Sequence, residues 1–221
     1  MPLLPLPKLR SEVVALSRRL HAAGWVANHD GNVSVRLTGD RFLITATAMS
    51  KAEIDDASLL IVDAQGAVLE GRKRPFSELE LHLAAYRARP EVEVVVHAHP
   101  PYASAFGLAE KEIAPVSMPE VVVSLGERIP TLPRALPKDP AALERVVACA
   151  SERDAFLLAG NGAITLGADL SQAFLRMELV EHYAKILHLA LSFGPVAPLA
   201  AADLQKLLDA RKKAGPGPRR E

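Results

Sequence analysis

The stretch VVVHAHP, residues 94–100, carries the most informative pattern in the chain. Its first half is too apolar for a strand with one face in solvent, so it predicts a buried strand in the centre of a sheet. Side chains two residues apart in a strand point to the same face, about 7 Å apart. His97 and His99 are therefore expected side by side, where Pro100 and Pro101 stop the strand.

Upstream of this stretch, helical and strand patterns follow one another. Apolar residues recur every three or four positions between residues 8 and 23, which predicts an amphipathic helix that Gly24 ends. Two pairs of alternating segments predict β-hairpins. They are residues 33–37 with 41–45, and residues 59–63 with 67–70.

Residues 77–89 predict a second helix. Ser77 is its expected N-cap, and Glu80 three residues on gives the spacing of a capping box. The pair Asp139-Pro140 predicts the start of a further helix, because Asp caps the free N–H groups and Pro is tolerated in the first turn.

The rest of the chain completes the predicted fold. Residues 155–159 predict another buried strand, and residues 170–193 predict a long helix closed by Gly194-Pro195. The order of elements predicts a mixed α/β domain with a largely antiparallel sheet, spanning residues 1–213. The tail at 214–221 has two Gly-Pro pairs and no apolar anchor, and is expected to be flexible.

Composition excludes several classes of function. The 221 residues include 26 Lys and Arg against 26 Asp and Glu, a balance that argues against nucleic acid or an anionic membrane as partner. Cys149 is the single cysteine, so neither an internal disulfide nor a cysteine-rich metal site is expected. No stretch reaches the roughly 18 apolar residues of a spanning helix, and the N-terminal segment lacks a signal-peptide cleavage site. A cytoplasmic protein is expected.

Two imidazoles on one strand face can converge on one metal ion if other ligands join them. Glu78 lies in the first turn of the helix before the strand of His97 and His99, and one Glu, two His and a water form a catalytic zinc set. Plainer alternatives stay open. In these alternatives the two histidines are solvated at a strand end. Glu78 then interacts only with the positive end of its helix dipole, or pairs with His82.

Small residues in three turns form a second candidate site. They are Gly31, Asn32, Thr47 and Ser77. Small hydrogen-bond donors of this kind can bind a phosphate, although Gly-Asn is mainly a turn dipeptide, so simple turn formation remains the alternative.

Taken in order, these motifs resemble the class II aldolase/adducin family over about residues 8–190. The family includes fuculose-phosphate and rhamnulose-phosphate aldolases and methylthioribulose-phosphate dehydratase. The resemblance is carried by Gly24-Trp25, GNVSVR at 31–36, ITAT at 44–47, Ser77-Glu78, LHLAAY at 81–86, VVVHAHP at 94–100, and residues 157–162 and 173–181.

The resemblance implies a three-layer α/β/α fold around a mainly antiparallel sheet, assembled as a homotetramer with active sites between subunits. In the aldolases a zinc ion is held by one glutamate and three histidines, which places Glu78, His97 and His99 on the metal. Zinc would act as a Lewis acid that stabilises an enediolate as a carbon–carbon bond breaks. Glu78 would leave the metal to move a proton, and the turns at Gly31, Asn32, Thr47 and Ser77 would bind phosphate.

The chain departs from the family at both sites. The usual third histidine is replaced by Asn161 in the segment GNG at 160–162, and a neutral amide oxygen is a weak zinc ligand. Weak zinc binding, or another divalent metal, is therefore expected. Asp30 brings a carboxylate toward the phosphate turns, where two like charges about 4 Å apart repel by roughly 1–4 kcal/mol. Ala48 and Phe76 replace an expected glycine and serine.

Further residues are compared with the catalytic groups of the family. The tyrosine acid of the aldolases falls at Met118, and Glu120 resembles in position the catalytic glutamate of the dehydratase branch. Pro119-Glu120 also fits a simple helix start. Lys51 is expected at the surface, and Glu181 is expected on a solvated or subunit-facing stripe of the last long helix.

The sequence thus predicts a metal-dependent lyase of aldolase type that cleaves a small sugar-derived ketose or ketose phosphate. Dehydration of the methylthioribulose-phosphate type is one alternative. The other is a non-catalytic, adducin-like oligomerisation or binding module, which Asp30, Phe76 and Asn161 favour because they alter the metal and phosphate sites.

Overall fold

The structure is a computed structural model that describes residues 5–136 and 139–214. Its strands are β1 (Asn32–Arg36), β2 (Arg41–Thr45), β3 (Leu59–Asp63), β4 (Val68–Glu70), β5 (Val94–Ala98), β6 (Thr131–Leu132), β7 (Ala155–Leu158) and β8 (Ala163–Gly167). In the described residues they form one sheet in the order β4-β3-β2-β1-β5-β8-β7-β6. Every neighbouring pair is antiparallel except β6 and β7, which confirms the mainly antiparallel sheet.

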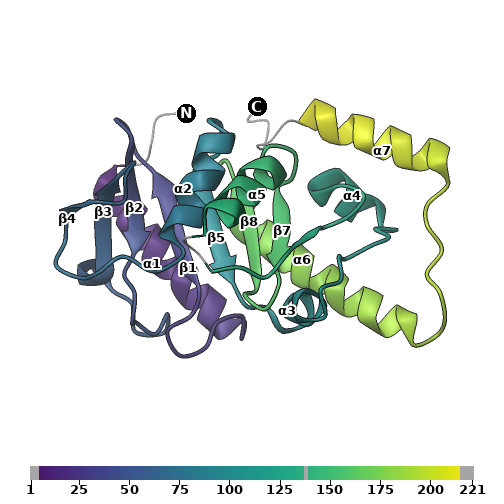
Figure 1. Ribbon diagram of the computed structural model, residues 1–221, viewed down its shortest axis with the longest axis horizontal. Coiled ribbons are helices and arrows are strands. Elements are labelled where there is room, and N and C mark those ends of the chain that lie inside the picture. Colours follow the sequence, from purple (N-terminus) through teal and green to yellow (C-terminus); the bar gives the residue numbers. More distant parts are fainter. Residues whose placement is uncertain (1–4, 137–138, 215–221) are drawn as a thin grey trace.

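Helices cover both faces of the sheet and make three layers (Figure 1). They are α1 (Leu6–Ala22), α2 (Leu79–Ala88), α3 (Pro101–Leu108), α4 (Pro119–Leu125), α5 (Pro140–Ala150), α6 (Leu170–Leu191) and α7 (Ala201–Ala214). Helices α2 and α5 pack together on one face, whereas α1 and α6 lie on the other. The predicted α/β/α architecture is confirmed.

Strand β5 holds the centre of the sheet between β1 and β8. Its side chains alternate between the two cores: Val94 and Val96 pack on the α1/α6 side, and Val95 packs on the α2/α5 side. Alternation therefore directs His97 toward the α2/α5 layer. The apolar run forms a central strand because both of its faces are covered, as predicted.

The start of α2 differs from the prediction. The helix begins at Leu79, and the structure shows no side-chain cap at Glu78, its N-cap residue. The Ser77 hydroxyl donates instead to Glu78 Oε2 at 2.8 Å, so it does not cap a backbone N–H group. The predicted capping box is wrong because a carboxylate next to Ser77 takes its hydroxyl.

Other element boundaries agree closely with expectation. Both predicted hairpins form. Asp139 caps α5 by accepting a hydrogen bond from the Ala141 N–H at 3.0 Å. Helix α6 ends at Leu191, two residues before the predicted end, and β8 and α7 were not predicted. The predicted tail from residue 214 lies outside the described residues apart from the last residue of α7.

Glu181 has a structural role that the sequence did not reveal. It is 9% exposed, and its two carboxylate oxygens accept hydrogen bonds from the N–H groups of Tyr102 and Ala103 in the first turn of α3. Burial raises the pKa of Glu181. The predicted solvated stripe is therefore wrong at this residue, which joins α6 to α3. In the part of the chain described here, no helix is long and apolar enough to cross a membrane.

Candidate functional site

His97 and His99 lie together at the end of β5. Their ring centroids are 5.0 Å apart, and His97 is 1% exposed. His97 faces Asn32 of β1 on one side and Ile164 of β8 on the other. The predicted side-by-side arrangement is confirmed, at the end of a strand that is buried along its whole length.

In each of the two imidazoles, one ring nitrogen faces an oxygen atom and the other has no hydrogen-bond partner among the described residues. His97 Nε2 donates to the main-chain oxygen of Asn161 at 2.8 Å, and His99 Nδ1 lies 3.4 Å from Asp30 Oδ2. His97 Nδ1 and His99 Nε2 are buried without a hydrogen-bond partner among the described residues. Metal-binding histidines commonly show this division, with an oxygen orienting one nitrogen while the other ligates. The two remaining nitrogens thus fit a pair of metal ligands.

Burial, helped by the neighbouring His99, lowers the pKa of His97 to about 4. At neutral pH the ring is therefore uncharged. The neutral imidazole is the form that can bind a metal ion.

Glu78 stands beside this pair at the start of α2. Its Oε2 accepts from the Ser77 hydroxyl at 2.8 Å and lies 3.5 Å from Asn32 Nδ2. The negative charge of the Glu78 carboxylate raises the pKa of His97, against the larger opposite effect of burial. Among the described residues, no three or more His, Cys, Asp or Glu side chains lie close enough together to hold a metal ion. The structure thus gives two candidate imidazole ligands with a carboxylate nearby, rather than a closed ligand set.

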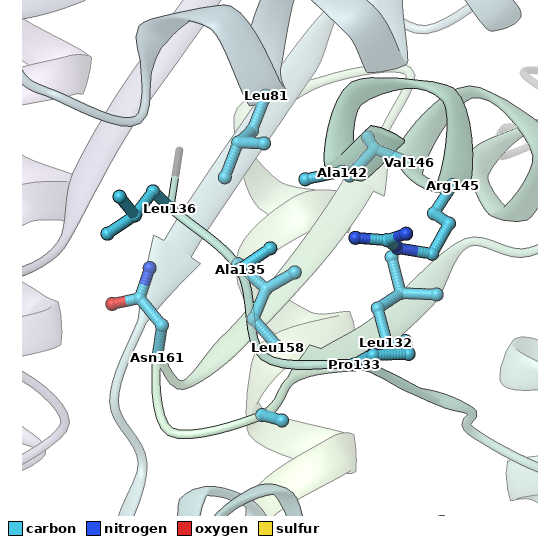
Figure 2. Close-up of a pocket in the computed structure, with 11 residues that line it drawn as sticks. Leu81, Leu132, Pro133, Ala135, Leu136, Ala142, Arg145, Val146, Leu158 and Asn161 are labelled. Atoms are coloured by element: carbon cyan, nitrogen blue, oxygen red, sulfur yellow. The ribbon is translucent and has the colours of Figure 1, made fainter. Parts of the chain in front are cut away.

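Asn161 contacts His97 through its main chain. Its side chain lines a small cavity of about 30 Å³ between α2, α5 and residues 132–136, where Figure 2 shows it beside Leu136. The turn around Asn161 is tight: Gly162 has φ +70°, and a Cβ there would clash with the Ala98 carbonyl and the His99 ring. The Asn161 amide as a metal ligand stays a prediction.

The predicted phosphate turns meet on the same side of the site. Asn32 approaches Glu78 and has a buried Oδ1 without a partner in the described part of the chain. The Thr47 N–H donates to the Arg74 carbonyl at 3.0 Å, which brings the Thr47 turn to the segment that carries Ser77. Gly31 has φ +70°, and a Cβ there would press on Val26 and on the His97 carbonyl. Asn32 begins β1 and the other three residues lie in loops near it, and phosphate binding there stays a prediction.

Asp30 and Ala48 show how two departures from the family pattern are accommodated. Asp30 Oδ1 accepts from the Ala27 N–H at 2.6 Å, while Oδ2 faces His99. Its carboxylate is thus positioned to orient His99. The sequence alone does not reveal this role. Ala48 has φ +56°, a left-handed conformation that suits the glycine expected there.

A buried polar network lies behind the site. The Ser34 hydroxyl is 2.7 Å from His82 Nδ1 and 2.9 Å from the Tyr86 hydroxyl. His82 is fully buried, and the ring of Phe76 packs against it at a centroid distance of 4.9 Å. Among the described contacts, Glu78 and His82 form no side-chain pair, which was one of the plainer alternatives: Ser34 lies against His82 Nδ1, and His82 Nε2 is buried without a partner.

Acidification is expected to destabilise the fold through His82. Burial lowers the pKa of His82 well below the usual 6.5. Below about pH 6.5 the unfolded chain therefore binds a proton at His82, whereas the folded chain keeps this ring neutral. Stability is thus full above pH 6.5 and falls as the pH drops. Urea unfolding at pH 7.5 and pH 5 measures the effect, which should be smaller in His82→Gln. The exposed His21→Gln serves as control, and an unchanged pH dependence in His82→Gln would contradict the assignment.

Lys51 does not lie where the sequence placed it. It is 1% exposed rather than on the surface, and its Nζ donates to the Met49 carbonyl at 3.1 Å. Burial lowers the pKa of Lys51, while the charges of Asp30 and Glu78 oppose that shift. The Lys51 ammonium group is therefore close enough to the site for its charge to interact with the carboxylates of Asp30 and Glu78.

Glu120 lies apart from these contacts. It is exposed in the first turn of α4, directly after Pro119, which confirms the helix start. Among the described hydrogen bonds and ion pairs, none joins Glu120 to Glu78, His97 or His99. A catalytic role for Glu120 stays a prediction.

The chain thus combines a three-layer α/β/α fold with a pair of histidines at the end of its central strand. The family model described as "Class II Aldolase and Adducin N-terminal domain" matches residues 11–188. The chain belongs to this family.

Relatives and solved structures agree with this assignment. The chain is 30% identical over 203 residues to the 3-oxo-tetronate 4-phosphate decarboxylase of Escherichia coli (strain K12), covering 90% of this chain and 94% of the relative. It is 30% identical over 184 residues to the L-fuculose phosphate aldolase of Methanococcus vannielii, covering 82% and 97%.

Two solved structures share the fold. One is an L-fuculose 1-phosphate aldolase, with a TM-score of 0.84 and 25% identity over 93% of this chain and 96% of that chain. The other is the l-fuculose-1-phosphate aldolase of Thermus thermophilus, with a TM-score of 0.74 and 29% identity over 88% and 100%.

Proposed function

We propose that the chain is a divalent-metal-dependent lyase that breaks a carbon–carbon bond in a small sugar-derived phosphate. The observation that carries the proposal is the pair His97 and His99, each with one buried nitrogen left without a partner in the described residues, beside the carboxylate of Glu78. Relatives named as aldolases and as decarboxylases both support it.

Aldol cleavage and decarboxylation of a 3-oxo acid share one chemical step. The bond between the carbon α to a carbonyl and the next carbon breaks, its electron pair forms a C=C bond, and the carbonyl π pair moves onto oxygen to give an enolate or enediolate. An aldehyde leaves in the first reaction, after its hydroxyl loses a proton, and carbon dioxide leaves in the second. A proton then returns to carbon. Both reactions therefore need stabilisation of an oxyanion and a group that delivers a proton.

His97 Nδ1, His99 Nε2 and a carboxylate oxygen of Glu78 are the groups that would hold the metal ion, and zinc is the ion that the family resemblance implies. A bound divalent ion would stabilise the negative oxygen of the enolate as a Lewis acid. The carbonyl of Asn161 and the carboxylate of Asp30 orient the two rings so that these nitrogens stay available.

Glu78 is the proposed proton carrier. Ser77 and Asn32 donate toward Oε2, whereas Oε1 has no partner among the described hydrogen bonds. Oε1 is thus the oxygen that would contact the metal and that, when it is off the metal, can accept a proton and return it to carbon. Held at one oxygen, the side chain keeps its position while the other oxygen changes protonation state.

The test is turnover of L-fuculose 1-phosphate and 3-oxo-tetronate 4-phosphate by purified protein, with zinc or manganese and with EDTA. Release of lactaldehyde or of carbon dioxide, lost in EDTA, is the expected result and separates the two reactions. Metal-independent turnover would contradict the role of the metal. Metal-bound protein without turnover of either compound would contradict the lyase assignment and favour the binding module.

A further inference from the structure

We propose that Lys51 is the cation that binds the phosphate group of the substrate, which makes it a specificity-determining residue. This inference rests on the proposed function, since it names how the same site holds a phosphorylated substrate. Its basis is an enclosed ammonium group with unused donors, positioned among the loops of Gly31, Thr47 and Ser77.

The first observation is the incomplete hydrogen bonding of a buried charge. Lys51 is 1% exposed, and an ammonium group carries three N–H donors. Among the described residues, its one hydrogen-bond acceptor is the Met49 carbonyl at 3.1 Å. A buried cation with spare donors is costly unless a ligand or water completes its shell.

The second observation is location. Lys51 lies in a turn four residues after Thr47, and the main chain of Thr47 is bonded to Arg74, three residues before Ser77. The charges of Asp30 and Glu78 both reach the ammonium group. Lys51 is therefore near the three loops that carry the predicted phosphate donors.

The third observation is charge balance. Asp30 and Glu78 are two carboxylates beside the site, and each is already oriented by other groups. Neither forms an ion pair with Lys51 in the described contacts. A phosphate bound at neighbouring loops would be repelled by both carboxylates, so a cation is needed to offset them. A compact ammonium group suits this task because it binds phosphate oxygen as a point charge.

The experiment measures binding of inorganic phosphate by isothermal titration calorimetry to the metal-loaded wild-type protein and to Lys51→Met. A lost charge-assisted hydrogen bond weakens binding by about 10–100-fold, which is the expected result for Lys51→Met. Lys73→Met is the matched control, because Lys73 is exposed and contacts the same Met49 through its sulfur. Lys73→Met should bind phosphate as the wild type does.

Thermal unfolding distinguishes a ligand role from a structural one. Methionine fills much of the space of lysine without a buried charge, so Lys51→Met should keep or raise the melting temperature. Lys51→Gln is the second variant, with the same expected loss of phosphate binding. Unchanged phosphate affinity in both variants would overturn the proposal. The proposal would also be overturned if the melting temperatures of both variants fell far enough to explain the lost phosphate binding.

Two further measurements separate this inference from the proposed function. Malonate titrated in place of phosphate tests a carboxylate ligand, and a loss confined to malonate would overturn the phosphate assignment. Metal content should be equal in wild type and Lys51→Met. Phosphate binding that needs Lys51 in a protein without lyase turnover would support the inference and contradict the proposed function.

Discussion

Glu78→Gln is expected to lower turnover of the proposed lyase by about 10²–10⁴-fold, the usual contribution of a positioned general acid–base. The amide retains an oxygen that can accept the Ser77 hydroxyl, which donates to the carboxylate at 2.8 Å, so the start of α2 should be preserved. What the variant lacks is the ability to exchange a proton with substrate. Steady-state kinetics with the substrate identified in the turnover assay measures the effect, which should fall mainly on kcat.

Glu80→Gln provides the matched control. Glu80 lies two residues further along the same helix and makes none of the described contacts with Ser77, Asn32 or the histidines. It should keep nearly full turnover. Equal activity of Glu78→Gln and Glu80→Gln would remove Glu78 from the reaction.

Asp154→Ala is expected to cost about 3–5 kcal/mol of stability, the typical result of removing one partner from a buried ion network. Asp154 is 3% exposed and forms ion pairs with Arg89 at 2.9 Å, with Arg176 at 3.1 Å and with Arg211. These arginines come from the end of α2, from α6 and from α7. The substitution would leave them facing one another without the carboxylate.

Asp203→Ala tests whether this effect depends on burial. Asp203 pairs with Lys206 at 2.9 Å on α7, where both side chains are mostly exposed, and such pairs contribute about 0–1 kcal/mol. Urea unfolding of both variants gives the comparison. If Asp154→Ala lowered the free energy of unfolding by less than about 1 kcal/mol, the ion pairs of Asp154 with α6 and α7 would not contribute to stability as expected.

The sequence predicted the centre of the fold well because hydrophobic periodicity is local. The run at residues 94–96 indicated a central strand, and strand alternation placed His97 beside His99. The capping box failed for an equally local reason, since Glu78 competed for the Ser77 hydroxyl. Periodicity could not anticipate that competition.

Roles that depend on contacts between distant loops escaped prediction. Lys51 looked like a surface residue because nothing near it in sequence shows that the segments around Asp30 and Glu78 fold against its turn. Asp30 was expected only as a source of repulsion for a phosphate, and its contact with His99 could not be predicted from the sequence. Glu181 looked solvated because its partners, the N–H groups that begin α3, are about 80 residues away in the chain.

Decarboxylation was also not predicted. The motifs around Glu78, His97 and His99 indicated the family, and they did not distinguish the reactions that its members carry out. Several relatives are named as decarboxylases and others as aldolases.

The most direct test of the proposed metal site is the metal content of protein purified without added metal or chelator, measured by elemental mass spectrometry beside His97→Ala/His99→Ala. The proposed function predicts a divalent ion near one equivalent per chain in the wild type and its loss in the double variant. Wild-type protein that holds no divalent ion, even after zinc is supplied and excess removed, would contradict it.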